Sequence, residues 1–213
     1  MGIDGTMSTV ATGGRSFYGA RLGLLVRRTR FPRLPGDPAN ARSFPFSVRY
    51  AVLEQADRTA ALDAAERLLD EGAEGIGLAF NAEFDLADAL DAPYAGGLAT
   101  QRDLIETMLP PSAEVGVLAF SADNDRIAAP GYLADAVAAD QDRLDVERAR
   151  DSLAAAAERA VSNRPGIAAW LLEEPEMGPF ASDIRAATGR PVYDRTRFLA
   201  WFHASLAPRV FPR

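Results

Sequence analysis

Residues 166–174 read Gly-Ile-Ala-Ala-Trp-Leu-Leu-Glu-Glu, an apolar run that ends in two adjacent acids. A short, continuous apolar run of this kind is typical of a strand buried on both faces of a parallel sheet. Polar groups that directly follow such a strand lie where open α/β sheets collect their ligands. The stretch therefore predicts both a class of fold and the place of a functional site.

Further apolar runs recur along the chain, and helical patterns separate them. The predicted strands cover residues 20–26, 50–53, 75–80, 114–120, 167–172 and 191–193. The predicted helices cover residues 59–71, 101–109, 146–161, 179–187 and 197–206, and a short helix or loop is expected at 81–91. Strands that alternate with helices predict an α/β fold with parallel sheets covered on both faces. Residues 1–17 lack periodicity and are expected to be a disordered tail.

The composition limits the chemistry that the chain can perform. It has 213 residues, no cysteine, no lysine and a single histidine. The lack of cysteine excludes thiolate nucleophiles and disulfides, and the lack of lysine excludes Schiff-base catalysis. One histidine cannot form a metal cluster by itself, so we expect neither a metal nor a cofactor. Proton transfer must then rest mainly on carboxylates.

Charge and hydropathy indicate the expected compartment and partners. The net charge of −7 and the pI near 4.8 argue against a non-specific nucleic-acid binder, which normally carries a basic face. No window approaches the roughly 18 apolar residues of a membrane span. Residues 1–14 do not read as a secretory signal. We expect a cytoplasmic protein with no nucleic-acid or membrane partner.

Two stretches resemble one protein family. Residues 30–37 (Arg-Phe-Pro-Arg-Leu-Pro-Gly-Asp), then Asn40 and the Phe-Pro-Phe at 44–46, are similar to the loop after the first strand in the aspartate/glutamate racemase superfamily. Residues 172–181 (Leu-Glu-Glu-Pro-Glu-Met-Gly-Pro-Phe-Ala) are similar to a segment of that superfamily usually written LECTNMPPYA, and residues 186–194 continue the likeness. The superfamily includes hydantoin racemase, maleate isomerase and arylmalonate decarboxylase.

The resemblance covers residues 18–208 in element order and implies two pseudo-symmetric α/β lobes with the active site between them. Residues 18–99, completed by 190–213, would form the first lobe, and residues 100–189 the second. The resemblance also implies a homodimer, for which the aromatic helix at 197–206 offers an apolar surface.

The chain departs from the family pattern at both catalytic positions. Family members move a proton alpha to a carboxylate with one cysteine from each lobe. Here the second position falls on Glu174 and the first on Phe80, or on Asn81 if the register slips by one residue. A thiol-pair racemase is therefore excluded. The apolar turn at residues 78–80 favours a bulkier or less charged substrate than an acidic amino acid.

Three residues are candidates for the chemistry. We expect Glu174 to be a general acid or base, because partial desolvation raises the pKa of a carboxyl group toward neutrality. The alternative is that Glu174 faces solvent or pairs with an arginine such as Arg30. Asn81 is expected to hydrogen-bond the substrate. Glu83 is a candidate for the opposite acid or base, although it also reads as a solvated acid in the first turn of a helix.

The other candidates are expected to bind substrate or to order the site. They are Asn40, Arg30, Phe80, Ser121 and Glu173. Arg30 reads equally as a partner of surface acids, and Ser121 reads equally as a helix cap. Glu173 keeps the glutamate of the family segment and is expected to accept hydrogen bonds from loop amides.

Three functions follow from this pattern. The leading hypothesis is a cofactor-independent lyase, cyclase or isomerase in which Glu174 transfers a proton alpha to a carbonyl or carboxylate of a small, relatively apolar metabolite. A catalytically silent binding or partner subunit with the same fold is the alternative. The third hypothesis is an epimerase in which Glu174 and Glu83 act from opposite faces.

Overall fold

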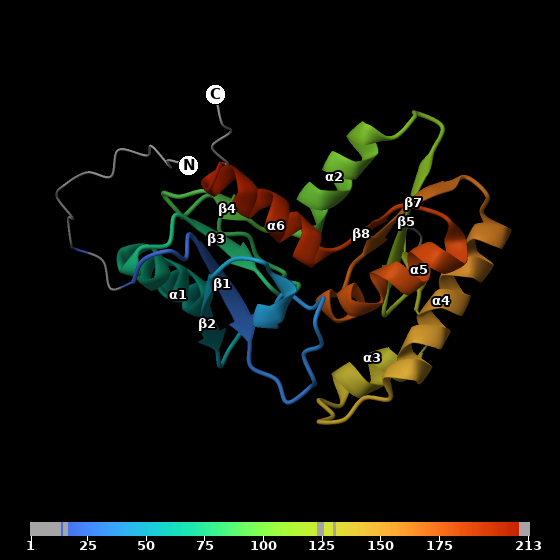
Figure 1. The fold of residues 1–213 in the computed structure, drawn as a ribbon, viewed down its shortest axis with the longest axis horizontal. Coiled ribbons are helices and arrows are strands. Elements are labelled where there is room, and N and C mark those ends of the chain that lie inside the picture. Colours follow the sequence, from blue (N-terminus) through green and yellow to red (C-terminus); the bar gives the residue numbers. More distant parts are fainter. Residues whose placement is uncertain (1–13, 15–16, 123–125, 130, 209–213) are drawn as a thin grey trace, which may run out of the picture.

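The computed structural model of the chain describes residues 14, 17–122, 126–129 and 131–208. They form two lobes, each built on a four-stranded parallel sheet (Figure 1). The strand orders are β2-β1-β3-β4 and β6-β5-β7-β8. The predicted α/β fold with two parallel-sheet lobes is confirmed. The expected disordered tail falls on residues 1–17, of which 1–13, 15 and 16 lie outside the described residues.

The first sheet lies against helix α1 on one face. Its strands are β1 (Leu22–Arg27), β2 (Val48–Leu53), β3 (Gly75–Leu78) and β4 (Tyr94–Ala95). Helix α1 (Arg58–Glu71) begins where the Asp57 side chain accepts a hydrogen bond from the backbone of Ala60, and it ends at Gly72 with φ of 120°. Small residues on the inner face of α1 allow it to approach Leu25 and Ile76 closely.

The second sheet carries three helices on one face. Its strands are β5 (Glu114–Ala119), β6 (Arg126–Ala128), β7 (Ile167–Leu172) and β8 (Val192–Tyr193), and the helices are α3 (Gly131–Ala138), α4 (Val146–Asn163) and α5 (Ala181–Thr188). Trp170 of β7 is fully buried in this core. Its ring lies over Gly116, where a Cβ would come within 2.8 Å of the indole, so the strand needs glycine at that point.

The two lobes exchange a helix. Helix α2 (Leu98–Met108) follows β4 of the first sheet, yet its Ile105 packs on Val115 and Val117 of the second. Helix α6 (Arg195–Leu206) follows β8 of the second sheet, and its Leu199 packs on Leu22 and Leu24 of the first. Figure 1 shows the red helix α6 over the first lobe and the green helix α2 beside the second. Each lobe is therefore completed by a segment that comes from the other.

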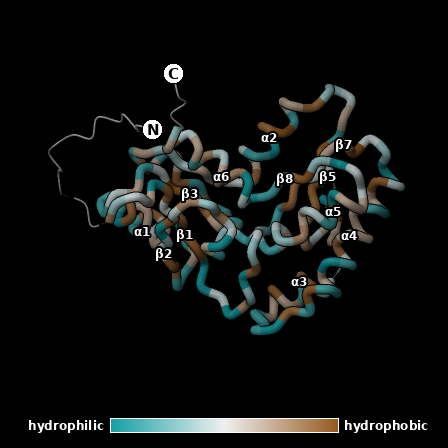
Figure 2. Tube along the Cα trace, in the orientation of Figure 1, coloured by the Kyte–Doolittle hydropathy of each residue, from teal (hydrophilic) through white to brown (hydrophobic). Residues whose placement is uncertain are grey.

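The apolar surface of both lobes lies mainly inside. Figure 2 shows hydrophobic colour along the strands of the two sheets. Within the described residues, none of the helices has the length and hydrophobicity required to cross a bilayer.

The structure differs from the predicted elements in three places. The short strands β4 and β6 were not predicted, since two or three residues show no pattern of their own, and helix α3 was not predicted either. Residues 81–91 form a loop, one of the two forms expected for that segment. The 3-10 helix η2 (Pro175–Phe180) precedes α5, with Pro175 in its first turn. Strand β8 pairs with β7, so the second lobe extends to Tyr193, beyond its predicted end at 189.

Candidate active site

The carboxyl ends of strands from both sheets meet between the lobes. Asn81 follows β3 of the first sheet, and Glu173 and Glu174 follow β7 of the second. Arg195, at the start of α6, connects them, because its Nη2 donates to Asn81 Oδ1 at 3.1 Å and its charge is stabilised by the Glu173 carboxylate. We call this set, together with Phe120 at the end of β5, the carboxyl-edge site: Asn81, Phe120, Glu173, Glu174 and Arg195.

The carboxyl group of Glu174 has fewer polar partners than its buried position requires. It is half-buried, and its Oε1 accepts a hydrogen bond of 3.3 Å from the backbone N–H of Phe120. Its Oε2 is buried without a hydrogen-bond partner in the described part of the chain. Burial raises the pKa of Glu174 from 4.5 to about 7, against the opposing effect of the Phe120 N–H. The group can therefore give or take a proton near neutral pH.

These observations decide between the two interpretations of Glu174 that the sequence left open. Its side chain is not in bulk water, and Arg30 pairs elsewhere. Burial and the neighbouring charges of Glu173 and Glu176 account for the raised pKa. The physical setting that general acid/base chemistry requires is present at this residue.

Glu173, the neighbouring acid, has a different environment. Its Oε2 lies 2.6 Å from Nε of Arg126, on strand β6 two strands away in the same sheet, and 14% of its side chain is exposed. The expectation that its carboxylate accepts loop amides is wrong, because this ion pair occupies it. Its backbone N–H donates to the Leu118 carbonyl and so continues the pairing of β5 with β7. Glu173 thus supplies fixed negative charge next to Glu174.

Arg195 was missed by sequence reasoning. Only 2% of the residue is exposed, and its Nη1 donates to the Gly96 carbonyl at 2.5 Å. Its Nε is buried without a hydrogen-bond partner, and no described carboxylate lies within ion-pair distance. Burial lowers its pKa to about 10, which leaves it charged at neutral pH. A buried cation without a carboxylate partner is costly, so this guanidinium is suited to an anion.

A sequence signal for Arg195 was present. The residue directly follows Asp194, whose side chain caps α6 by accepting from the backbone of Arg197. A cation in the first turn of a helix is disfavoured by the helix dipole, so a buried arginine there needs another reason.

Phe80 and Glu83 differ in their surroundings. Phe80 is 4% exposed and packs edge-on against Phe84 in the core of the first lobe, with ring centroids 6.5 Å apart. Its ring therefore serves the core, and the expected role in substrate binding is wrong. Glu83 is exposed in the loop that follows β3, and Ser121 is exposed after β5. Their roles stay predictions.

The candidates in the first loop are occupied by other contacts. Asn40 donates from Nδ2 to the Arg33 carbonyl at 2.7 Å, and its Oδ1 accepts from the backbone of Arg42 and caps the 3-10 helix η1 (Ala41–Ser43). Arg30 forms an exposed ion pair of 3.1 Å with Asp142. Asn40 thus orders the loop and Arg30 pairs with a surface acid, as the alternative for Arg30 expects, and the binding roles of both stay predictions.

The two stretches that resemble the family lie against each other. Arg33 donates from Nη1 to Asp37 at 2.8 Å and to Glu176 at 2.7 Å, and all three side chains are largely buried. A Cβ at Gly36 would lie 2.7 Å from the backbone of Pro179. The first loop is thus joined by charge and by close backbone contact to the segment that carries Glu174.

The described residues contain no group of three or more His, Asp or Glu side chains arranged to hold a metal ion. The single histidine, His203, lies on α6 with its ring stacked on Phe46 at a centroid distance of 3.5 Å.

Comparison with known proteins places this geometry among enzymes of one fold. No family model matches the chain. A dimethylsulfoniopropionate lyase from Durusdinium sp. clade D is 41% identical over 51 residues, which are 24% of this chain and only 17% of that protein. The match therefore spans less than a fifth of the relative.

Solved structures match over nearly the whole chain. Allantoin racemase from Klebsiella pneumoniae has a TM-score of 0.60 and 14% identity over 87% of each chain. Arylmalonate decarboxylase has a TM-score of 0.59 and 17% identity over 88% of this chain and 92% of that chain. Glutamate racemase RacE1 from Bacillus anthracis has a TM-score of 0.57 and 14% identity over 88% and 81%. The chain therefore has the fold of the aspartate/glutamate racemase superfamily, and it carries that fold without a cysteine.

Proposed function

We propose that the chain is a cofactor-independent lyase in which Glu174 is the single general acid/base for proton transfer at the carbon alpha to a carboxylate. The observation that carries this proposal is the half-buried Glu174 carboxyl, with a pKa of about 7 and one oxygen without a partner. It follows β7 at the position where the family segment has a catalytic cysteine. A carboxyl group with a pKa near the working pH is the most effective proton carrier.

The surroundings of the site favour one acid/base group over two. A racemase must remove a proton from one face of a carbon and return it on the other. On the side of the first lobe, Phe80 occupies the other cysteine position and is buried in the core. Asn81 does not ionise, and Glu83 is exposed to solvent. Reactions that need a proton carrier on one face only, namely elimination and decarboxylation, fit this arrangement best.

In both reactions, Glu174 can be the only group of the protein that takes or gives a proton. In an elimination, the Glu174 carboxylate takes the proton from the alpha carbon. The electron pair of that C–H bond forms a double bond to the beta carbon, and the leaving group departs with the electrons of its own bond. In a decarboxylation, the bond to the departing carboxylate breaks, carbon dioxide leaves and the electron pair remains as an enolate. Protonated Glu174 then delivers its proton to the alpha carbon.

Negative charge on the substrate develops or persists in both reactions. The Arg195 guanidinium is buried, charged and free of a carboxylate partner, which supports a role in binding that charge. Its hydrogen bond to Asn81 holds it in orientation. A buried, preorganised cation stabilises an enolate more strongly than a solvated cation would.

The comparisons supply the first substrates to test. A lyase of dimethylsulfoniopropionate acts on a carboxylate with a sulfonium leaving group on the beta carbon, and an arylmalonate decarboxylase acts on a dicarboxylate with an apolar body. Allantoin and glutamate are the matching tests for racemisation.

The test combines turnover with isotope exchange. The wild-type protein is incubated in deuterated water with each of the four compounds, and release of product and exchange at the alpha carbon are followed by NMR. We expect Glu174→Gln to lower kcat/KM by roughly 10²- to 10⁴-fold, the usual contribution of general acid/base catalysis. Glu83→Gln is the control and is expected to change it less than about twofold, because Glu83 is exposed.

The pH dependence identifies the direction of proton transfer. With a pKa of about 7, an elimination that needs the Glu174 carboxylate accelerates as pH rises through 7, and a decarboxylation that needs the acid slows. Equal losses in both variants would indicate an epimerase with two carboxylates. Full activity in Glu174→Gln would remove this mechanism, and binding without turnover or exchange would indicate a silent binding subunit.

A further inference from the structure

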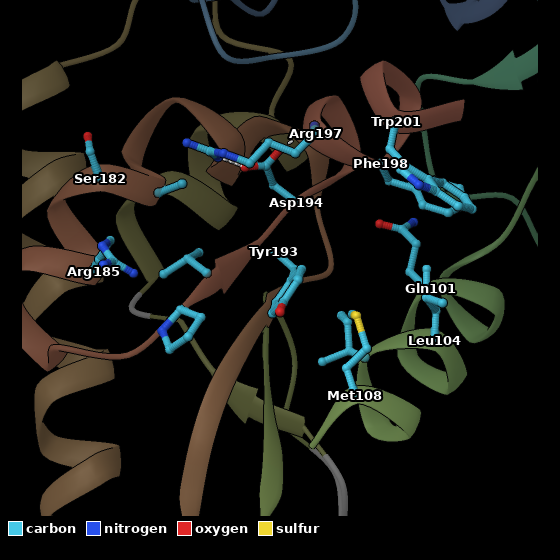
Figure 3. A pocket seen from close by; sticks show the side chains of 14 residues that line it. Gln101, Leu104, Met108, Ser182, Arg185, Tyr193, Asp194, Arg197, Phe198 and Trp201 are labelled. Atoms are coloured by element: carbon cyan, nitrogen blue, oxygen red, sulfur yellow. Dashed lines mark hydrogen bonds and ion pairs between the residues drawn. The ribbon is translucent and has the colours of Figure 1, made fainter. Parts of the chain in front are cut away.

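A cavity lies apart from the carboxyl-edge site. It has a volume of about 620 Å³ and is enclosed by the exchanged helices α2 and α6, by α5 and by the end of β8 (Figure 3). None of the five residues of the carboxyl-edge site lines it. Small-molecule sites in proteins usually measure roughly 300–1,000 Å³. The cavity therefore has the size of a site for a metabolite.

Apolar side chains line most of this cavity. Met108 of α2 and Trp201 of α6 are 55% and 58% exposed, and Leu104 is 38% exposed. Figure 3 shows Leu104 and Met108 on one wall, facing Phe198 and Trp201 of the other helix. Large apolar side chains gathered in a concave surface indicate a binding site, whereas single ones scattered over a surface do not.

One polar group in the apolar part has no partner. Gln101 of α2 is 3% exposed, and its Nε2 makes no hydrogen bond within the described residues. Figure 3 shows its amide directed from α2 into the space beside Phe198. A buried donor without an acceptor is unfavourable, and a ligand oxygen at this point would remove that cost.

The opposite end of the cavity carries a free positive charge. Arg185 of α5 is exposed, and its guanidinium forms no hydrogen bond or ion pair with any described residue. Ser182 lies beside it, one turn earlier on the same helix. Arg197 also lines the cavity, but the carboxylate of Asp194 neutralises it. The charge left unpaired is therefore positive, and it lies at the open end.

We propose that this cavity binds a monocarboxylate with an apolar body and one acceptor oxygen. The carboxylate pairs with Arg185, the body lies on Tyr193 between α2 and α6, and the acceptor oxygen takes the hydrogen bond of Gln101 Nε2. A second carboxylate is disfavoured, because Arg197, the other cation of the lining, already pairs with Asp194. The site is independent of the reaction proposed for Glu174.

The test uses 9-oxodecanoate as the probe, with decanoate and 2-decanone as analogues that lack the ketone and the carboxylate. Binding to the full chain is measured by calorimetry at pH 7, and the emission of Trp201 in the cavity wall reports the place of binding. We expect Gln101→Leu to lower the affinity for 9-oxodecanoate about 5- to 10-fold and not to lower the affinity for decanoate. Arg185→Gln is expected to weaken both carboxylates and to leave 2-decanone unchanged.

Matched variants separate this site from other effects. Arg159→Gln removes an exposed arginine of α4 outside the cavity and should bind all probes as the wild type does. Glu174→Gln should also keep wild-type affinity, so the two proposals fail or succeed separately. Absence of saturable binding, or equal affinities in all variants, would overturn the site. If light scattering shows a dimer, and if Trp201→Ser dissociates that dimer, the cavity is instead a contact surface for a second copy of the chain.

Discussion

Burial distinguishes three acids that follow strands of the two sheets. Glu173 is held in an ion pair with Arg126, Glu83 is exposed in a loop, and Glu174 is enclosed with only one backbone donor. Desolvation without a neutralising partner is what raises the pKa of Glu174 to about 7. The same residue type therefore has three different chemistries, and its surroundings decide which one it has.

The raised pKa of Glu174 makes stability depend on pH. Folding favours the protonated form, since the pKa in the folded protein, about 7, exceeds the ordinary 4.5. This contribution is complete below pH 4.5 and is lost as pH rises through 7. Relative to the wild type, Glu174→Gln should therefore gain up to about 3 kcal/mol in unfolding free energy between pH 4.5 and 8. Urea titrations at several pH values measure the difference, and parallel pH profiles of the two proteins would contradict it.

The arginines of the first loop differ in their contribution to stability. Arg33 pairs with two carboxylates that are 1% and 7% exposed, whereas the Arg30 side chain is 72% exposed in its pair with Asp142. We expect Arg33→Ala to lower the unfolding free energy by about 3–5 kcal/mol, because two buried acids lose their partner. Arg30→Ala should cost less than about 1 kcal/mol. Chemical unfolding compares them, and similar losses would refute the argument.

At the scale of elements, the contact between the first loop and η2 holds the segment that carries Glu174. The Gly36 carbonyl accepts from Thr196 Oγ1 at 2.6 Å and faces Gly178, where a Cβ would lie 2.5 Å from it. Two backbones can approach this closely only where side chains are absent. The loop, η2 and the start of α6 therefore form one rigid junction between the lobes.

This junction should be sensitive to one added methyl group. We expect Gly178→Ala to destabilise the protein by about 1–3 kcal/mol, because the clash is with backbone and cannot be relieved by a rotamer change. Gly97→Ala is the matched control, since its nearest neighbouring atom would be 4.0 Å away and its φ is −56°. Thermal unfolding of the two variants checks the prediction. Equal melting temperatures would show that the contact yields without cost.

For the whole molecule, the exchange of α2 and α6 couples the two lobes. One face of each sheet is covered by a helix that directly follows a strand of the other sheet in the sequence. Unfolding either lobe therefore removes apolar cover from the other. We infer that the lobes do not unfold independently, in contrast to domains joined only by a linker.

This coupling predicts a single unfolding transition. In Trp201→Phe the remaining tryptophan is Trp170, which is fully buried in the second lobe, whereas helical ellipticity reports both lobes. The two signals should follow the same urea curve, because coincident probes are the mark of two-state unfolding. The exposed position of Trp201 makes the substitution mild. Separate midpoints for fluorescence and ellipticity would contradict the coupling.

The local pattern of the sequence determined much of this protein. The apolar run at Ile167–Leu172, the helix at residues 59–71 and the segment around Glu174 were all predicted before the structure, since the spacing of apolar residues indicates which face of an element is buried. The absence of cysteine was also decisive, because it excluded thiol chemistry on this fold.

The tertiary structure alone decided which of those residues meet. Arg195 and Asn81 are 114 positions apart, and Arg33 and Glu176 are 143 apart, so no local pattern could pair them. The burial that shifts the pKa of Glu174, the free amide of Gln101 and the core position of Phe80 arise only when segments distant in the sequence pack together. Periodicity along a chain reports whether a residue is buried. What it is buried against is a property of the packed molecule.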